Sequence, residues 1–242
     1  MQIPRIYHDG PLAIGTSVEL TPQAGNHVSR VLRLKPGSPV TMFNGRGGEY
    51  PATLHSIEKK SVVVHIDDFA DISLESPLRV TLAQGISRGE RMDYTIQKAV
   101  ELGVSRIVPI ATSRTVVNLR GERAEKRLEH WRAIIHSACE QCGRNYVPTL
   151  ECITRIDSWL GQTLAGPGLL LDHRAEHAMG NLPAIQNVTL LIGPEGGLSE
   201  DERQSALKAG YQGIRMGPRV LRTETAALVA LAALQTRMGD LG

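Results

Sequence analysis

The chain has 242 residues, of which 41% are hydrophobic and 21% are charged, and its formal net charge is +2. This length and composition predict a folded protein with one large domain or two modest domains, and so small a net charge does not by itself indicate a nucleic-acid partner. No apolar run of about eighteen residues occurs and no charged and then apolar segment opens the sequence, so we expect neither a membrane-spanning nor a secreted protein.

The first part of the sequence predicts a small β-barrel. Its short apolar segments lie at 40–43, 49–57 and 62–66. Regularly spaced short strands separated by Asn-Gly and Lys-Lys turns are typical of such barrels. Residues 73–77 have the composition of a linker, so we expect one domain over residues 1–72 and a second over residues 73–242.

The rest of the sequence predicts an α/β domain. Its expected strands lie at 78–82, 107–110, 169–171, 188–192 and 214–216. Between the first two strands, Met92, Ile96 and Val100 share one face of a helix that Gly103 ends, which completes a β-α-β unit. The continuous apolar run at 188–192 suits a buried parallel strand.

A loop rich in glycine and proline, Gly-Pro-Glu-Gly-Gly at 193–197, follows that strand. Glycine permits backbone angles and close approaches that a Cβ would block, and Pro194 removes a donor and stiffens the loop. Ser199 and Glu202 have the spacing of a capping box, so a helix is expected to begin there. Such a loop can hold a small polar ligand against bare backbone, although a tight connection without a ligand remains an alternative.

A second segment of the same kind runs from 216 to 226 and reads Met-Gly-Pro-Arg-Val-Leu-Arg-Thr-Glu-Thr-Ala. Thr223 is the expected N-cap of the last helix, with Glu224 in its first turn. Residues 226–234 are apolar on almost every face, so this helix is expected to be buried in the domain or against a second subunit. Two such loops after neighbouring strands make a ligand site the first hypothesis.

Other cofactor motifs receive little support. No Gly-x-Gly-x-x-Gly follows a strand and no P-loop motif occurs, which argues against a dinucleotide fold and a P-loop. His136, Cys139, Cys142 and Cys152 could be drawn as a zinc site, but helical spacing aligns the first three only loosely, and packed thiols are preferred. We expect no metal, and the three cysteines suit a reducing cytoplasm, the expected location.

Basic residues concentrate in the middle of the chain. Residues 73–150 hold twelve Lys or Arg and eight Asp or Glu, a net charge of +4. At 122–129 acids and bases interleave at helical spacing, which is typical of a solvated helix face. The arginines without such partners, and therefore the candidate phosphate contacts, are Arg88, Arg91, Arg114 and Arg144.

The two C-terminal segments together resemble the signature of the RsmE family of bacterial 16S ribosomal RNA uridine-N3 methyltransferases, a branch of the SPOUT superfamily. Further segments in the same order along the whole chain are similar to that family: 3–7, 30–33, 87–91, 97–104 and 140–144. The resemblance implies a SPOUT-type trefoil-knotted α/β domain, with the helix at 223–237 threaded through a loop, and a PUA-like RNA-binding barrel before it. It also implies S-adenosyl-L-methionine as cofactor, 16S ribosomal RNA or the assembled small subunit as partner, and a homodimer.

The resemblance also implies where these ligands bind. The expected cofactor-binding residues are Leu171, Ile192, Gly193, Pro194, Glu195, Gly196, Met216, Gly217, Val220, Leu221, Thr223, Thr225 and Ala226. The expected RNA contacts of the barrel are Arg5, Arg30, Arg33 and Arg46. Because residues 1–72 have no net charge, a barrel that only packs against the second domain remains an alternative.

The implied chemistry is an in-line methyl transfer to uridine N3, which first has to lose its proton. Arg222 and Arg219 are candidates to stabilise the resulting anion, and Glu195 or Glu224 is the candidate proton acceptor. The alternative for Arg222 and Glu224 is a structural ion pair. N3 lies on the pairing edge, so the target base has to be unpaired or flipped out.

Two other functions stay open at this point: a SPOUT methyltransferase acting on another RNA nucleotide, and a non-catalytic RNA-binding protein in ribosome assembly. Both cofactor loops are intact, which favours an enzyme. The chain carries Asp172-His173 where the family pattern has His-Pro, so the role of His173 is open.

Overall fold

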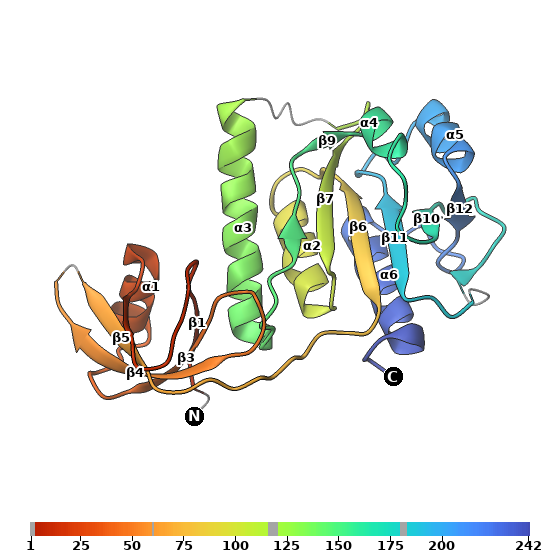
Figure 1. Cartoon of the computed structure of the whole chain (residues 1–242). Helices are drawn as coiled ribbons and strands as arrows, with labels where there is room; N and C mark the ends of the chain where they lie inside the picture. The colour runs from red at the N-terminus through yellow and green to blue at the C-terminus, as the bar shows by residue number, and fades with distance from the viewer. Residues whose placement is uncertain (1–2, 60, 116–120, 180–182) are drawn as a thin grey trace. The chain divides into compact units, whose positions relative to one another are not determined.

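The computed structural model describes residues 3–59, 61–115, 121–179 and 183–242 (Figure 1). Its internal contacts divide the chain into two units. The first comprises Met1–Glu75 together with His136–Val147, and the second comprises Ser76–Ile135 together with Pro148–Gly242. The expected ranges 1–72 and 73–242 are consecutive, whereas by these contacts His136–Val147 groups with the first unit.

The first unit is a curled five-stranded sheet with the strand order β1-β3-β4-β5-β2. Its strands are β1 (Arg5–Tyr7), β2 (Ser17–Glu19), β3 (Pro39–Phe43), β4 (Tyr50–Ile57) and β5 (Val62–Ile66). A short helix, α1 (Pro22–Asn26), and one turn of π-helix, η1 (His27–Val31), join β2 to β3. Alternate residues of β4 and β5 are buried, among them Leu54 and Val64, so one face of the sheet makes the core.

Polar contacts explain why the later segment groups with this sheet. The Tyr7 amide donates to a carboxylate oxygen of Glu140 at 2.9 Å, and the Tyr7 ring stacks on His136 with the centroids 3.9 Å apart. Asn145, fully buried, donates its side-chain amide to the Ile72 carbonyl at 3.0 Å. These partners lie so far apart in the sequence that local patterns could not have revealed them.

The second unit is built on a parallel sheet with the order β12-β10-β11-β6-β7-β8, and β9 also pairs with β7. Its strands are β6 (Arg79–Gly85), β7 (Arg106–Ala111), β8 (Thr149–Leu150), β9 (Thr154–Arg155), β10 (Gly168–Leu171), β11 (Asn187–Ile192) and β12 (Tyr211–Ile214). Every ladder among them is parallel. The predicted α/β architecture is confirmed, and the apolar run of β11 is buried from Val188 onward.

Helices cover both faces of this sheet. They are α2 (Glu90–Glu101), α4 (Ile156–Leu160), α5 (Glu200–Lys208) and α6 (Thr223–Met238), and α3 (Glu122–Cys142) belongs to this unit up to Ile135. Helices α2 and α6 pack side by side, and α6 also contacts β6 and β11 (Figure 1). Ala83 of β6 packs in a cluster with α4 and α5, whereas its neighbour Gln84 bonds to α6, so the two helix pairs lie on opposite faces.

The last strand and helix depart from the sequence expectation in two details. Strand β12 runs from Tyr211 to Ile214, so it shares only Ile214 with the expected strand at 214–216, and the Arg215 amide donates to the His177 carbonyl at 2.8 Å. Helix α6 begins at Thr223 with Arg222 as its N-cap residue, and no side chain caps it. The prediction of Thr223 as N-cap was therefore wrong. The capping box of Ser199 and Glu202 at the start of α5 is confirmed.

Candidate functional site

A cleft of about 680 Å³ in the second unit lies where strands β10, β11 and β12 end. The carboxyl ends of parallel strands meet at one edge of a sheet, and the loops that follow them there are the usual place for ligands. All of the predicted cofactor-binding residues except Gly217 and Thr225 line this cleft. The four candidate catalytic residues line it too, namely Glu195, Arg219, Arg222 and Glu224.

The loop after β11 is folded so tightly that it needs glycine. A Cβ on Gly193 would lie 2.9 Å from the Gly197 carbonyl carbon and 2.9 Å from the Leu198 nitrogen. Gly197 has a φ of +67° and donates its amide to the Pro194 carbonyl at 2.8 Å. At Gly196, by contrast, a Cβ would only touch the Arg114 side chain at 3.4 Å. Bare backbone therefore forms this wall of the cleft.

Basic residues from two other segments hold the loop in place. The guanidinium group of Arg114 donates to the Gly196 carbonyl at 2.6 Å. The Arg88 amide and the Arg91 guanidinium donate to one carboxylate oxygen of Glu195 at 2.8 and 3.0 Å. Arg91 and Arg114, predicted from sequence as phosphate contacts, thus already bind the loop. The Arg88 side chain is not needed for this contact, and the residue is exposed.

Those contacts keep Glu195 ionised. Burial raises the pKa of its carboxyl group, but the hydrogen bonds from the Arg88 amide, from its own backbone and from Arg91 outweigh burial, so the pKa lies below its usual value. A carboxylate with a lowered pKa is a poor proton acceptor. Glu195 is therefore a weaker base here than an ordinary glutamate.

Thr223 ties the start of α6 to the loop. Its hydroxyl donates to the Gly193 carbonyl at 2.6 Å and accepts a hydrogen bond from the Gln84 side-chain nitrogen at 2.9 Å. Gln84 is fully buried at the end of β6. Sequence reasoning missed Gln84, although a polar residue at the end of an otherwise apolar strand was a usable signal.

The arginines of the segment before α6 are free to act on a ligand. Arg219 and Arg222 are exposed at the cleft, and Glu224 is half-buried there. Among the residues that the structure describes, neither arginine has an ion-pair partner, and Arg222 does not pair with Glu224. The structural ion pair considered for Arg222 and Glu224 is therefore not formed.

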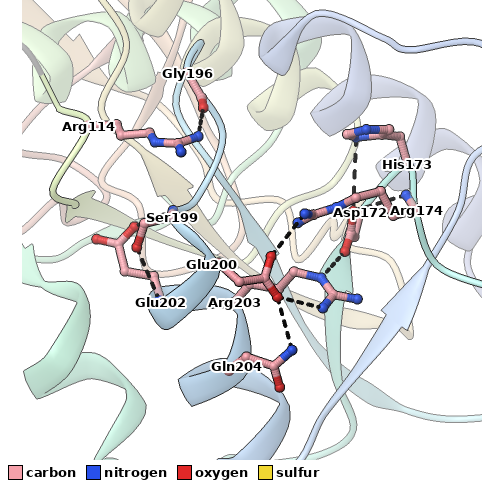
Figure 2. A network of polar contacts seen from close by, with 10 residues as sticks. All are labelled: Arg114, Asp172, His173, Arg174, Gly196, Ser199, Glu200, Glu202, Arg203 and Gln204. Atoms are coloured by element: carbon pink, nitrogen blue, oxygen red, sulfur yellow. Dashed lines mark hydrogen bonds and ion pairs between the residues drawn. The ribbon is translucent and has the colours of Figure 1, made fainter.

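A network of charged side chains supports the wall of the cleft that follows β10 (Figure 2). Asp172 is bound by the guanidinium group of Arg203, and that of Arg174 donates to it at 3.1 Å. Both arginines also reach Glu200, at 3.2 and 3.0 Å, so the loop after β10 is fastened to the start of α5. Burial raises the pKa of Asp172, but the hydrogen bonds from Arg203 and Arg174 outweigh it and lower the pKa below its usual value.

The network shows that Asp172 and His173 have different surroundings. The Asp172 side chain is 7% exposed, whereas His173 points outward with 59% exposure and its Nδ1 lies 3.9 Å from the carboxylate. Asp172 is therefore the residue that shapes this wall, and the sequence analysis did not single it out. Its signal was the departure from the family pattern at 172–173.

Two arginines proposed as RNA contacts are engaged inside the first unit. Arg5 pairs with Glu49, 44 residues away, and its side chain is 11% exposed. Arg144 donates its Nε to Glu75 at 2.9 Å, 69 residues away, and is 6% exposed. We therefore correct their assignment from phosphate contact to structural ion pair. Arg30, Arg33 and Arg46 are exposed.

The described residues contain no group of three His, Cys, Asp or Glu side chains that could hold a metal ion. Burial raises the pKa of the Cys139 thiol to about 12, so this cysteine is a packed, protonated thiol. Within the described part of the chain, no helix is both long and apolar enough to cross a membrane.

Both units match known protein families. A family model described as an RNA methyltransferase domain matches residues 74–235, and one described as an RNA methyltransferase PUA domain matches residues 20–67. The chain is 35% identical to the ribosomal RNA small subunit methyltransferase E of Buchnera aphidicola from Acyrthosiphon pisum, over 99% of this chain and 95% of that protein. It is 29% identical to the protein of the same name from Bacillus subtilis, over 89% and 88%.

Solved structures agree with this. A Legionella pneumophila protein in complex with the cofactor SAM is 41% identical, with a TM-score of 0.97 over the whole of both chains. The ribosomal RNA small subunit methyltransferase E of Neisseria gonorrhoeae, bound to S-adenosyl methionine, is 39% identical, with a TM-score of 0.92 over the whole of both chains. The predicted fold class, a SPOUT-type α/β domain with a PUA-like domain before it, is confirmed.

Proposed function

Because the chain belongs to the RNA methyltransferase family that includes the ribosomal RNA small subunit methyltransferase E proteins, we propose that it methylates N3 of a uridine in 16S ribosomal RNA, with S-adenosyl-L-methionine as methyl donor. The observation that carries the proposal is the cleft at the strand ends, where a bare glycine loop faces two arginines that have no ion-pair partner among the described residues. We also propose a cytoplasmic location, because the proposed substrate is ribosomal RNA.

The residues of the cleft fit this cofactor. Gly193, Gly196 and Gly197 line the cleft, so part of this wall presents peptide groups without a side chain. Leu171, Ile192 and Leu221 add apolar surface on which an adenine ring can lie. When bound, the cofactor supplies an electrophilic methyl group on a sulfonium.

The chain's own residues handle the charge and the proton of the uracil. Arg219 and Arg222 stabilise the negative charge that develops on the carbonyl oxygens when N3 loses its proton, and this stabilisation is strongest where water is excluded. Glu224 accepts that proton, because the hydrogen bonds from the Arg88 amide and the Arg91 guanidinium lower the pKa of Glu195 and make it a weak base. Such a reaction requires the target base to be unpaired or flipped out.

We also propose a homodimer in which each copy helps to complete the other's site. Helix α6 leaves Val229 40% exposed, and Leu228, Ala232 and Ala233 are only half-buried. A helix that is apolar nearly all round is stable when another surface covers it. A second copy of the chain would provide that cover.

The test uses 16S RNA from a strain that lacks this protein. The RNA is incubated with the purified chain and S-adenosyl-L-methionine, digested to nucleosides and analysed by mass spectrometry, with naked RNA and assembled small subunits as parallel substrates. Formation of 3-methyluridine is expected. A different methylated nucleoside would indicate another RNA target, and RNA binding without methylation would indicate a non-catalytic assembly protein.

A further inference from the structure

Charge is segregated within the first unit. Residues 1–72 hold seven Lys or Arg and seven Asp or Glu, but residues 20–48 hold four Lys or Arg and no Asp or Glu. All seven acidic residues, and the other three basic residues, lie outside 20–48. Although residues 1–72 have no net charge, residues 20–48 carry a net charge of +4, a local excess that attracts a polyanion.

The centre of this segment, residues 27–35, forms an outward-pointing turn that we call the tip. It begins with the π-helix η1, in which the Leu32 amide donates to the His27 carbonyl at 2.9 Å. Val28 is fully buried, Leu34 packs against the same core, and the Leu34 amide donates to the Val28 carbonyl at 3.1 Å. Both ends of the tip are thus fixed to the core of the unit, and the residues between them face outward.

Those outward residues include two aliphatic side chains. Val31 is 68% exposed and Leu32 is 37% exposed, although each has a buried neighbour a few positions away. Arg33 has a φ of 54°, the only positive value among non-glycine residues in the described part of the chain. A strained backbone and a π-helical turn in the same few residues are features that concentrate at functional sites.

Cations flank the two aliphatic residues in the sequence. Arg30, Arg33 and Lys35 are exposed, and none of them has an ion pair with any residue that the structure describes. An apolar pair flanked by free cations matches a nucleic acid, in which phosphates and flat apolar base faces lie close together. A second copy of the chain would bring an equally positive tip, which would repel the first.

We propose that the tip is an RNA-binding wedge, an inference that rests on the proposed function. Arg30, Arg33 and Lys35 contact phosphates, and Val31 and Leu32 contact the faces of unstacked bases in a loop or bulge of the small-subunit ribosomal RNA. The tip thus binds by apolar contact as well as by charge, and the first unit selects irregular RNA over a regular duplex.

Binding of the full-length chain to a 16S ribosomal RNA transcript, measured over a range of salt concentrations, separates the two contributions. Replacing Val31 and Leu32 together by serine should lower the affinity on the order of tenfold and leave the salt dependence unchanged, because only apolar contact is lost. Arg30→Ala and Lys35→Ala should each make the salt dependence shallower by about one ion. The matched control is Ile14→Ser, since Ile14 is an exposed aliphatic residue of the same unit outside the acid-free segment.

The RNA affinities of these variants decide whether the tip binds RNA through its apolar residues. Wild-type RNA affinity in the Val31→Ser, Leu32→Ser variant, with folding verified by circular dichroism, overturns the wedge, and so does a loss no larger than that of Ile14→Ser. A change in sedimentation with unchanged RNA affinity identifies the tip as a protein contact and also overturns it. If the wild type binds RNA through the tip but forms no methylated nucleoside, the proposed function fails and the wedge stands.

Discussion

Replacing Thr223 by valine tests the link between helix α6 and the loop of the cleft. Valine has nearly the same shape as threonine, but it lacks the hydroxyl group that joins Gly193 to Gln84. The Thr223 residue is 7% exposed, so water cannot easily replace the lost partner. The Gly193 carbonyl then loses its hydrogen bond, whereas the Gln84 side chain keeps one bond to the Gly85 carbonyl at 3.1 Å.

An unsatisfied buried polar group costs about 1 to 3 kcal/mol, so Thr223→Val should destabilise the second unit by about that amount. Thr223→Ser keeps the hydroxyl and is the matched control, and it should cost about 1 kcal/mol or less for the lost methyl group. Thermal unfolding of both variants measures stability, and calorimetry with S-adenosyl-L-methionine measures the effect on the loop. Equal stability and equal cofactor affinity for the two variants would refute the role of the hydroxyl group.

Three further predictions follow from the same contacts. Gly193→Ala should lower affinity for S-adenosyl-L-methionine at least tenfold in calorimetry, since its Cβ meets backbone at 2.9 Å, whereas Gly196→Ala, which meets only a side chain at 3.4 Å, should change it little. The pKa of Asp172 is lowered in the native state, so its stabilising contribution is present above its unfolded pKa of about 4 and is lost as the pH falls through the native pKa. Asp172→Asn should therefore lower the melting temperature at pH 7 much more than at pH 3. An equal drop at both pH values would contradict this. Val229→Glu should produce monomers of about 26 kDa with reduced methylation, and a fully active monomer in sedimentation experiments would exclude the proposed dimer.

The sequence predicted features that depend on neighbouring residues. The apolar run before residue 193 became β11, the Ser199 and Glu202 spacing became a capping box, and the glycine loop became a wall of the cleft. Each of these follows from backbone geometry within a few residues, so a local pattern is enough to predict it.

Features that depend on distant partners could not be predicted in this way. Arg144 and Arg5 were expected to contact RNA, because nothing near them in the sequence reveals Glu75 or Glu49. Threonine is a residue type that favours the N-cap position, but the Thr223 hydroxyl donates instead to the Gly193 carbonyl, 30 residues away. In each case the side chain bonds to a residue far away in the sequence, so patterns of neighbouring residues predicted the wrong role for it.

Arg222 is the residue of the cleft proposed to act most directly on the uracil during methyl transfer to N3. The most direct test follows an isotopically labelled methyl group from S-adenosyl-L-methionine into 16S ribosomal RNA in a single turnover, with both ligands saturating, for the wild type and for Arg222→Ala. We expect label at N3 of one uridine, and a rate for the variant that is lower by about a hundredfold while its affinity for RNA is unchanged. Label in another nucleoside, or a wild-type rate in Arg222→Ala, would contradict it.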